Sequence, residues 1–177
     1  MTLGRRSLGH GRKLPRLMAQ SKETPPEVTM SAFPGPLIDA LLRTAARLET
    51  GVDYQWGHQG ACNCGHLAQT ITQLSPAQIH AAAIRRAVED WGEQAREYCP
   101  GSGFPMDYIL SRIMDLGVSA QDIGRLERLS DPRVVRRVGR LDLRHNRRED
   151  VIVYMRAWAA LLAEDAALGE AAAERAA

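Results

Sequence analysis

Residues 75–98, SPAQIHAAAIRRAVEDWGEQAREY, carry the clearest secondary-structure signal in the chain. Ser75 can cap a helix, Pro76 suits a first turn, and Gln78 stands where the partner in a capping box belongs. Apolar residues then recur at spacings of four, three, four and three, which is one face of a helix: Ile84, Val88, Trp91, Ala95 and Tyr98. The stretch predicts one long amphipathic helix, and extending its apolar stripe back by four residues places His80 on the buried face.

Capped and periodic segments of the same kind occupy most of the chain after residue 36. They predict helices over about 37–49, 63–73, 106–116, 120–129, 132–139 and 146–168. Asn146 and Glu149 read as the capping box of the last helix. No segment alternates between apolar and polar residues as a half-buried strand does. The predicted fold class is all-α, a single irregular bundle of about seven helices with a disordered N-terminal tail.

Length and composition indicate one domain with tails. The chain has 177 residues, of which 45% are hydrophobic and 25% charged, the values of an ordinary globular protein. Residues 1–33 are basic and then proline-rich, and they predict a disordered tail. Residues 34–168 predict the helical domain, and the alanine-rich residues 169–177 predict a frayed end. Because there is neither a long apolar run nor a signal-peptide pattern, we expect a cytoplasmic protein with no membrane partner.

A cysteine and histidine cluster lies in the sequence YQWGHQGACNCGH, residues 54–66. It places four metal-ligand side chains within nine residues: His58, Cys62, Cys64 and His66. Thiolate and imidazole together suit zinc, iron or copper, although Cys-x-Cys is a poor match to the spacing of common structural zinc sites. The short turn between the helices at 63–73 and 75–98 brings His80 within reach of this segment. We therefore expect a metal site, zinc or iron, built from some of these five residues.

Two other interpretations of the cluster stay open. Cys62 or Cys64 at the start of a helix would meet the positive end of the helix dipole and nearby imidazoles, which lower a thiol pKa and create a nucleophile for an acyl carbon. Alternatively, both cysteines are inert packed side chains, as buried cysteine often is. The functional hypothesis is a small soluble protein with a Cys/His site in which metal binding ranks ahead of thiol reactivity, and whether the protein is an enzyme stays open.

The cluster also carries a resemblance. Together with Trp91 to Gln94 and Asn146 to Trp158, it resembles a group of small bacterial proteins of uncharacterised activity that share Trp-Gly-His followed by Cys-Asn-Cys-Gly-His. The resemblance covers about residues 37–164. It implies a bacterial single-domain protein, and it implies no activity.

An alternative function rests on arginine. Nine arginines fall between residues 125 and 148, opposed by three acidic residues, and residues 116–123 are similar to the turn of a helix-turn-helix protein. These side chains predict a nucleic-acid- or partner-binding face, formed by Arg125, Arg128, Arg133, Arg136, Arg137 and Arg140. The competing interpretation is an ordinary solvated helix surface. The formal net charge of the chain, +2, is too small to decide between them.

Overall fold

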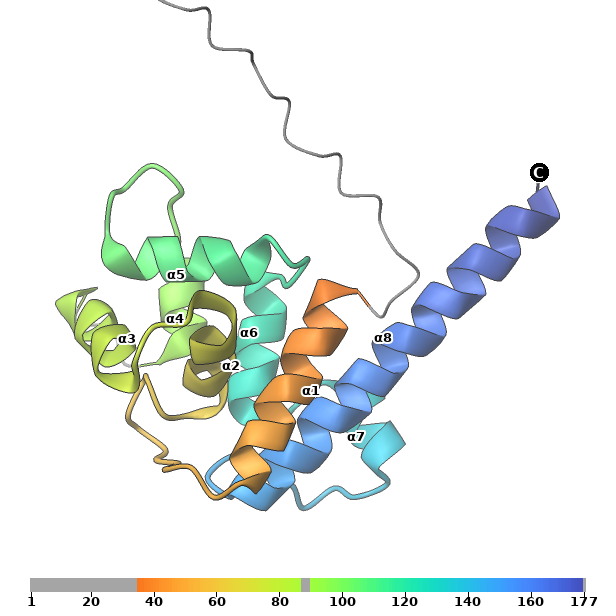
Figure 1. Ribbon diagram of the computed structural model, residues 1–177, viewed down its shortest axis with the longest axis horizontal. Helices are drawn as coiled ribbons and strands as arrows, with labels where there is room; N and C mark the ends of the chain where they lie inside the picture. Colours follow the sequence, from red (N-terminus) through yellow and green to blue (C-terminus); the bar gives the residue numbers. More distant parts are fainter. Residues whose placement is uncertain (1–34, 87–89, 177) are drawn as a thin grey trace, which may run out of the picture. The chain divides into compact units, whose positions relative to one another are not determined.

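The computed structural model describes residues 35–86 and 90–176. The predicted tail over residues 1–33 lies outside these ranges. The described residues form eight α-helices, one 3₁₀ helix and no strand (Figure 1), so the all-α prediction is confirmed. The elements are α1 (Pro36–Glu49), α2 (Asn63–Thr72), α3 (Pro76–Ala83), η1 (Ile84–Arg86), α4 (Trp91–Arg96), α5 (Pro105–Met114), α6 (Ala120–Arg128), α7 (Pro132–Val138) and α8 (Arg148–Ala176).

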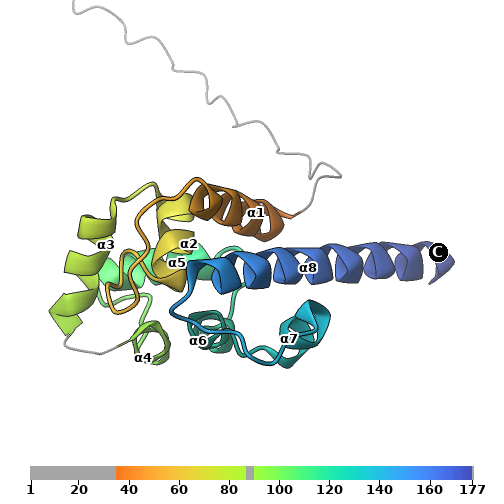
Figure 2. The same cartoon turned by 90° about the horizontal axis from the view of Figure 1, so that it is seen from below.

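Helix α1 lies along the first half of α8, side by side in both views (Figures 1 and 2). Leu41 and Leu48 of α1 are completely buried, as are Val151 and Met155 of α8. An ion pair of 2.6 Å between Glu49 and Arg156 joins the same two helices. Residues 169–176, which were predicted to fray, form the last turns of α8 and have mostly exposed side chains.

Helix α2 occupies the centre of the core. It contacts α1, α3, α5 and α6, and its first eight residues, 63–70, are all buried. A helix that is buried on every side has no solvated face for its polar residues, so these must find partners within the protein. The cysteine and histidine cluster therefore belongs to the interior.

The prediction of one helix over residues 75–98 is wrong. Helix α3 ends at Ala83, and a new helix, α4, begins after Asp90, whose carboxylate accepts a 3.0 Å hydrogen bond from the Glu93 amide. Ile84 is 57% exposed, whereas Trp91 and Ala95 are buried as predicted. Val88 lies outside the described residues.

One tertiary interaction and one local interaction account for this break. Arg86 turns toward α5, where its guanidinium forms a buried 2.5 Å ion pair with Asp107. Asp90 also caps the N-terminus of α4, so a new helix starts there. The split also explains why eight α-helices are observed where about seven were predicted.

The predicted cap of the last helix is also wrong. Helix α8 begins at Arg148, and Asn146 is exposed in the preceding turn. The loop is held instead by Asp150, which is 2% exposed and accepts hydrogen bonds from the Arg144 amide at 3.0 Å and the Arg140 guanidinium at 3.1 Å.

Candidate functional site

The glycines of the cluster let the chain pack against itself at the start of α2. A Cβ atom on Gly65 would lie only 2.3 Å from the Gln59 carbonyl oxygen, and one on Gly60 would lie 1.9 Å from the Pro76 carbonyl oxygen. The loop is fixed further by the Trp91 indole, which donates to the Gln59 carbonyl at 3.0 Å. Gln69 donates to the Gly60 carbonyl at 2.6 Å. The result is a rigid loop that sets the position of Cys62.

The five side chains predicted as metal ligands lie in three places. His58 and His80 stack on each other, Cys62 and Cys64 face α6, and His66 is held by Arg47. Within residues 35–86 and 90–176, no group of three or more His, Cys, Asp or Glu side chains is arranged to hold a metal ion. Metal binding by these residues stays a prediction.

The His80 side chain contacts the cluster by stacking on the His58 ring. The rings of His58 and His80 are stacked with centroids 4.0 Å apart and an interplanar angle of 19°. Both side chains are half-buried, so His80 is less buried than its predicted place on the apolar stripe required. Burial, together with the nearby charge of His58, lowers the pKa of His80.

The two thiols lie at the start of α2, opposite a glutamate of α6. The Cys62 Sγ lies 3.7 Å from Glu127 Oε2, and the Cys64 Sγ lies 3.4 Å from the Ile123 carbonyl oxygen. Each cysteine is 1% exposed and Glu127 is 5% exposed. A carboxylate is rarely buried to this extent without hydrogen-bond donors, and here the donors are the thiols and the backbone at Cys64.

Burial dominates the electrostatics of this group. It raises the pKa of Cys62 well above its ordinary value, and the negative charge of Glu127 acts in the same direction. The Gly65 amide and the Trp91 indole act in the opposite direction, because they stabilise a thiolate. Burial also raises the pKa of Glu127 to about 7, against the opposing hydrogen bonds from Cys64. The protonated thiol is therefore the resting form of Cys62.

A hydrogen-bond network fixes the three segments around these groups. The Asn63 amide nitrogen donates to the carbonyl oxygens of Leu126 and Glu127 at 3.2 and 2.9 Å. The Tyr54 hydroxyl lies 2.6 Å from Asn63 Oδ1 and 2.5 Å from the His145 carbonyl oxygen. Asn63 is completely buried. It thus connects the loop before α2, the end of α6 and the loop before α8.

Cys62 and Glu127 line a pocket of about 330 Å³. Trp56 and His145 form part of its wall, with their ring centroids 4.1 Å apart. The other lining residues are Gly57, Gln59, Asp90 and Arg128. A buried thiol, a carboxyl group of raised pKa and an aromatic wall in one concave site are the usual components of a small-molecule site. We call it the thiol pocket.

The sequence analysis did not identify Glu127, Asp90 or His145 as site residues. Glu127 stands four residues after Ile123, which is buried on the inward face of α6. An acidic residue on an apolar stripe was therefore the available signal. No comparable signal marked His145, because its place depends on the loop before α8.

His66 has a structural environment. It is 2% exposed, its Nδ1 lies 3.2 Å from the Arg47 guanidinium, and its Nε2 lies 3.1 Å from the Asp53 carbonyl oxygen. Burial, reinforced by the charge of Arg47, lowers the pKa of His66 to about 4. The ring is therefore neutral at neutral pH.

The arginine-rich segment is compensated by acidic residues, some within the segment and some from elsewhere in the chain. Arg133 pairs with Asp165 and Arg137 with Glu164, both at 2.7 Å. Arg128 pairs with Asp90 at 2.7 Å. Arg125 and Arg140 also have carboxylate partners. Nucleic-acid binding by this face stays a prediction.

Comparison of the chain with protein-family models, curated proteins and solved structures found no significant match. Among the residues that the structure describes, no helix has the length and apolar character needed to cross a membrane.

Proposed function

We propose that this protein is a cysteine-dependent enzyme in which Cys62 attacks an electrophilic carbon of a small ligand and Glu127 accepts the thiol proton. One observation carries the proposal: the Cys62 thiol and the Glu127 carboxyl group, 3.7 Å apart, line the same pocket. Cys62 precedes the first turn of α2, so the positive end of the helix dipole favours a thiolate there. We therefore rank thiol chemistry ahead of metal binding as the function of this site.

The chemical step conserves charge within the pocket. As the Sγ–C bond forms, the thiol proton moves to Glu127 Oε2, and the bond to the leaving group breaks with its electron pair on that group. Glu127 then returns the proton to the leaving group. A pKa near the working pH suits a group that must accept and return a proton, and that of Glu127 is about 7. The Gly65 amide and Trp91 indole stabilise the transient thiolate.

Alkylation under native conditions tests this proposal. In a Cys99→Ser background, which removes the exposed thiol, iodoacetamide should label Cys62 in the folded protein, and peptide mass spectrometry should locate the label. Cys64 lies outside the pocket lining and should stay unlabelled, so Cys64→Ser is the matched control. Glu127→Gln should decrease the labelling rate at pH 7, because it removes the group that accepts the thiol proton. Labelling of Cys62 only at the rate of global unfolding would refute the proposal.

A second candidate function is transition-metal binding by His58 and His80. The observation that favours it is that the Nδ1 atoms of both rings are buried with no hydrogen-bond partner in the described part of the chain. Two imidazoles side by side are suitable ligands for zinc or iron. His80→Ala should abolish metal uptake measured by elemental analysis, whereas His145→Ala should not. Equal metal content in the two variants would exclude this site.

A further inference from the structure

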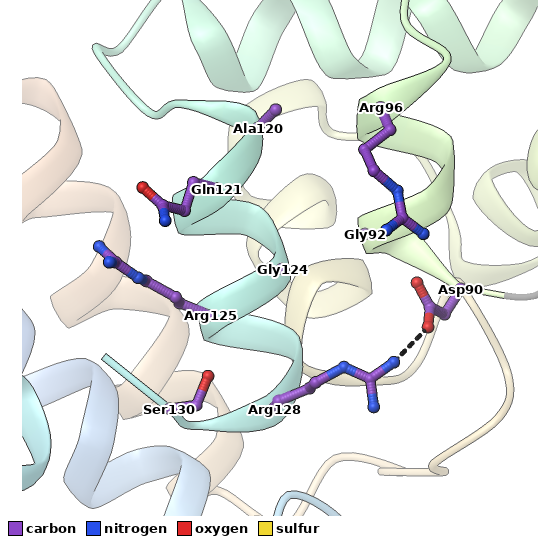
Figure 3. A pocket seen from close by; sticks show the side chains of 9 residues that line it. All are labelled: Asp90, Gly92, Arg96, Ala120, Gln121, Gly124, Arg125, Arg128 and Ser130. Carbon is purple, nitrogen blue, oxygen red and sulfur yellow. Dashed lines mark hydrogen bonds and ion pairs between the residues drawn. The ribbon is translucent and has the colours of Figure 1, made fainter. Parts of the chain in front are cut away.

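A second pocket adjoins the thiol pocket between α4 and α6 (Figure 3). Its volume is about 460 Å³, and Asp90 and Arg128 line both pockets. These two residues form an ion pair of 2.7 Å. The pair therefore stands at the shared boundary, and a ligand that reaches Cys62 from this side passes it. We call this second site the arginine pocket.

Three arginine side chains line the arginine pocket, those of Arg96, Arg125 and Arg128. Arg125 is engaged by Asp131 at 3.0 Å, and Figure 3 shows its side chain extending away from α4. The side chains of Arg96 and Arg128 instead flank the Asp90 carboxylate (Figure 3). The Arg96 side chain is 73% exposed and forms a long ion pair of 3.7 Å with Glu93. A guanidinium with so loose a partner can bind an oxyanion at little cost.

The floor of the arginine pocket is made by two glycines where the helices approach closely. A Cβ atom on Gly92 would lie 3.6 Å from the Gly124 Cα, and one on Gly124 would lie 3.9 Å from the Gly92 Cα. Without side chains at these positions, the pocket between α4 and α6 reaches down to the backbone, and the Asp90 carboxylate lies between Arg96 and Arg128 (Figure 3). The lining of the two pockets thus combines cationic groups at one end with a thiol at the other.

We infer that the ligand of the thiol pocket carries an oxyanion, a carboxylate or a phosphate, which Arg96 and Arg128 bind while its electrophilic carbon reaches Cys62. This inference rests on the proposed function, because it assigns the substrate class of the same site. Arg128 exchanges its partner Asp90 for the ligand, and the bound anion draws the chain of the ligand across the shared boundary. The oxyanion supplies binding and orientation, and the reaction itself stays with Cys62 and Glu127.

Matched alkylating reagents test the inference. In the Cys99→Ser background, Cys62 is alkylated either by N-iodoacetyl-β-alanine, which carries a carboxylate, or by its neutral methyl amide. With both reagents, the Cys62 Sγ displaces iodide, which leaves with the electron pair of the C–I bond. The intrinsic reactivity of the two reagents is therefore equal. The acid should react about tenfold faster than the amide, the lower end of electrostatic focusing in a cleft. The preference should decrease with added salt.

Three variants and one control variant locate the effect. Arg128→Gln and Arg96→Gln should each reduce the acid-to-amide ratio toward one. Arg112→Gln is the matched control, because Arg112 has a similar ion pair with Asp115 and lines neither pocket. Gly124→Ala should fold, since its Cβ would make an ordinary contact, yet it should reduce the ratio by filling the floor. Inorganic phosphate and acetate, added separately as competitors, distinguish the two oxyanions by which one slows labelling by the acid.

The outcomes separate this inference from the proposed function. If Cys62 reacts with the neutral amide and shows no preference for the acid, the inference is wrong and the thiol chemistry stands. A preference that persists in Arg96→Gln and Arg128→Gln likewise contradicts the arginine assignment. If neither reagent labels Cys62 in the folded protein, the proposed function and the inference both fail.

Discussion

The side-chain nitrogen of Asn63, Nδ2, donates a 2.9 Å hydrogen bond to the backbone carbonyl oxygen of Glu127, and thereby fixes α6 against the start of α2. The Glu127 side chain then faces the Cys62 thiol from the same junction. One buried side chain thus controls the distance between the two groups to which we assign the chemistry.

Asn63→Ala should destabilise the protein by roughly 2–4 kcal/mol, because it leaves the carbonyl groups of Leu126 and Glu127 buried without their donor. Chemical denaturation measures the free energy of unfolding. Thr72→Ala, which removes a partly buried hydroxyl that bonds locally to the Ala68 carbonyl and the Leu74 amide, is the control and should cost much less. A loss below 1 kcal/mol for Asn63→Ala would mean that water or a rearranged loop replaces the bond.

Gly65→Ala should be strongly destabilising, by roughly 3 kcal/mol or more, because its Cβ would collide with the Gln59 carbonyl oxygen. Gly169→Ala provides the matched control. Gly169 lies within α8 in open space, so alanine there should stabilise the protein by about 0.5–1 kcal/mol. Thermal unfolding of the two variants should show shifts of opposite sign, and equal shifts would contradict the close approach.

Glu127 should make stability depend on pH. Its pKa is raised from 4.5 to about 7 in the folded protein, so the protonated form favours folding. That contribution is fully present below pH 4.5 and is lost as the pH rises through 7, with a total of roughly 3 kcal/mol. Glu127→Gln, which stays neutral, should match the native protein near pH 4 and exceed its stability at pH 8. Parallel pH profiles for the two proteins would argue against the raised pKa.

His66 should make the protein less stable as the pH falls, which is the opposite of the effect of Glu127. Its pKa is lowered from 6.5 to about 4, so the neutral ring favours folding above pH 6.5 and this contribution is lost as the pH falls through 4. The expected loss is roughly 3 kcal/mol between these limits. NMR titration of the His66 ring should give a midpoint well below 6, and His66→Gln should lack this acid-sensitive component. A midpoint of 6 or above would overturn the assignment.

Local sequence determined the fold class and most helix boundaries. Ser75 with Gln78 and Ser119 with Asp122 form capping boxes, and the Asp131 side chain caps α7. Such signals can be read from sequence because donor and acceptor lie within four residues of each other. The composition and place of the cysteine cluster were also visible, since they need no knowledge of packing.

Tertiary structure alone decided which of these residues meet. Cys62 and Glu127 are 65 positions apart in the chain, and only the packing of α2 on α6 brings them together. The same packing separates the thiols from the stacked pair His58 and His80. It also broke the helix predicted over residues 75–98, because Arg86 gains a buried partner on α5. Periodicity fixes which face of a helix is apolar, whereas the identity of the neighbour across that face depends on how all the helices fill the core together.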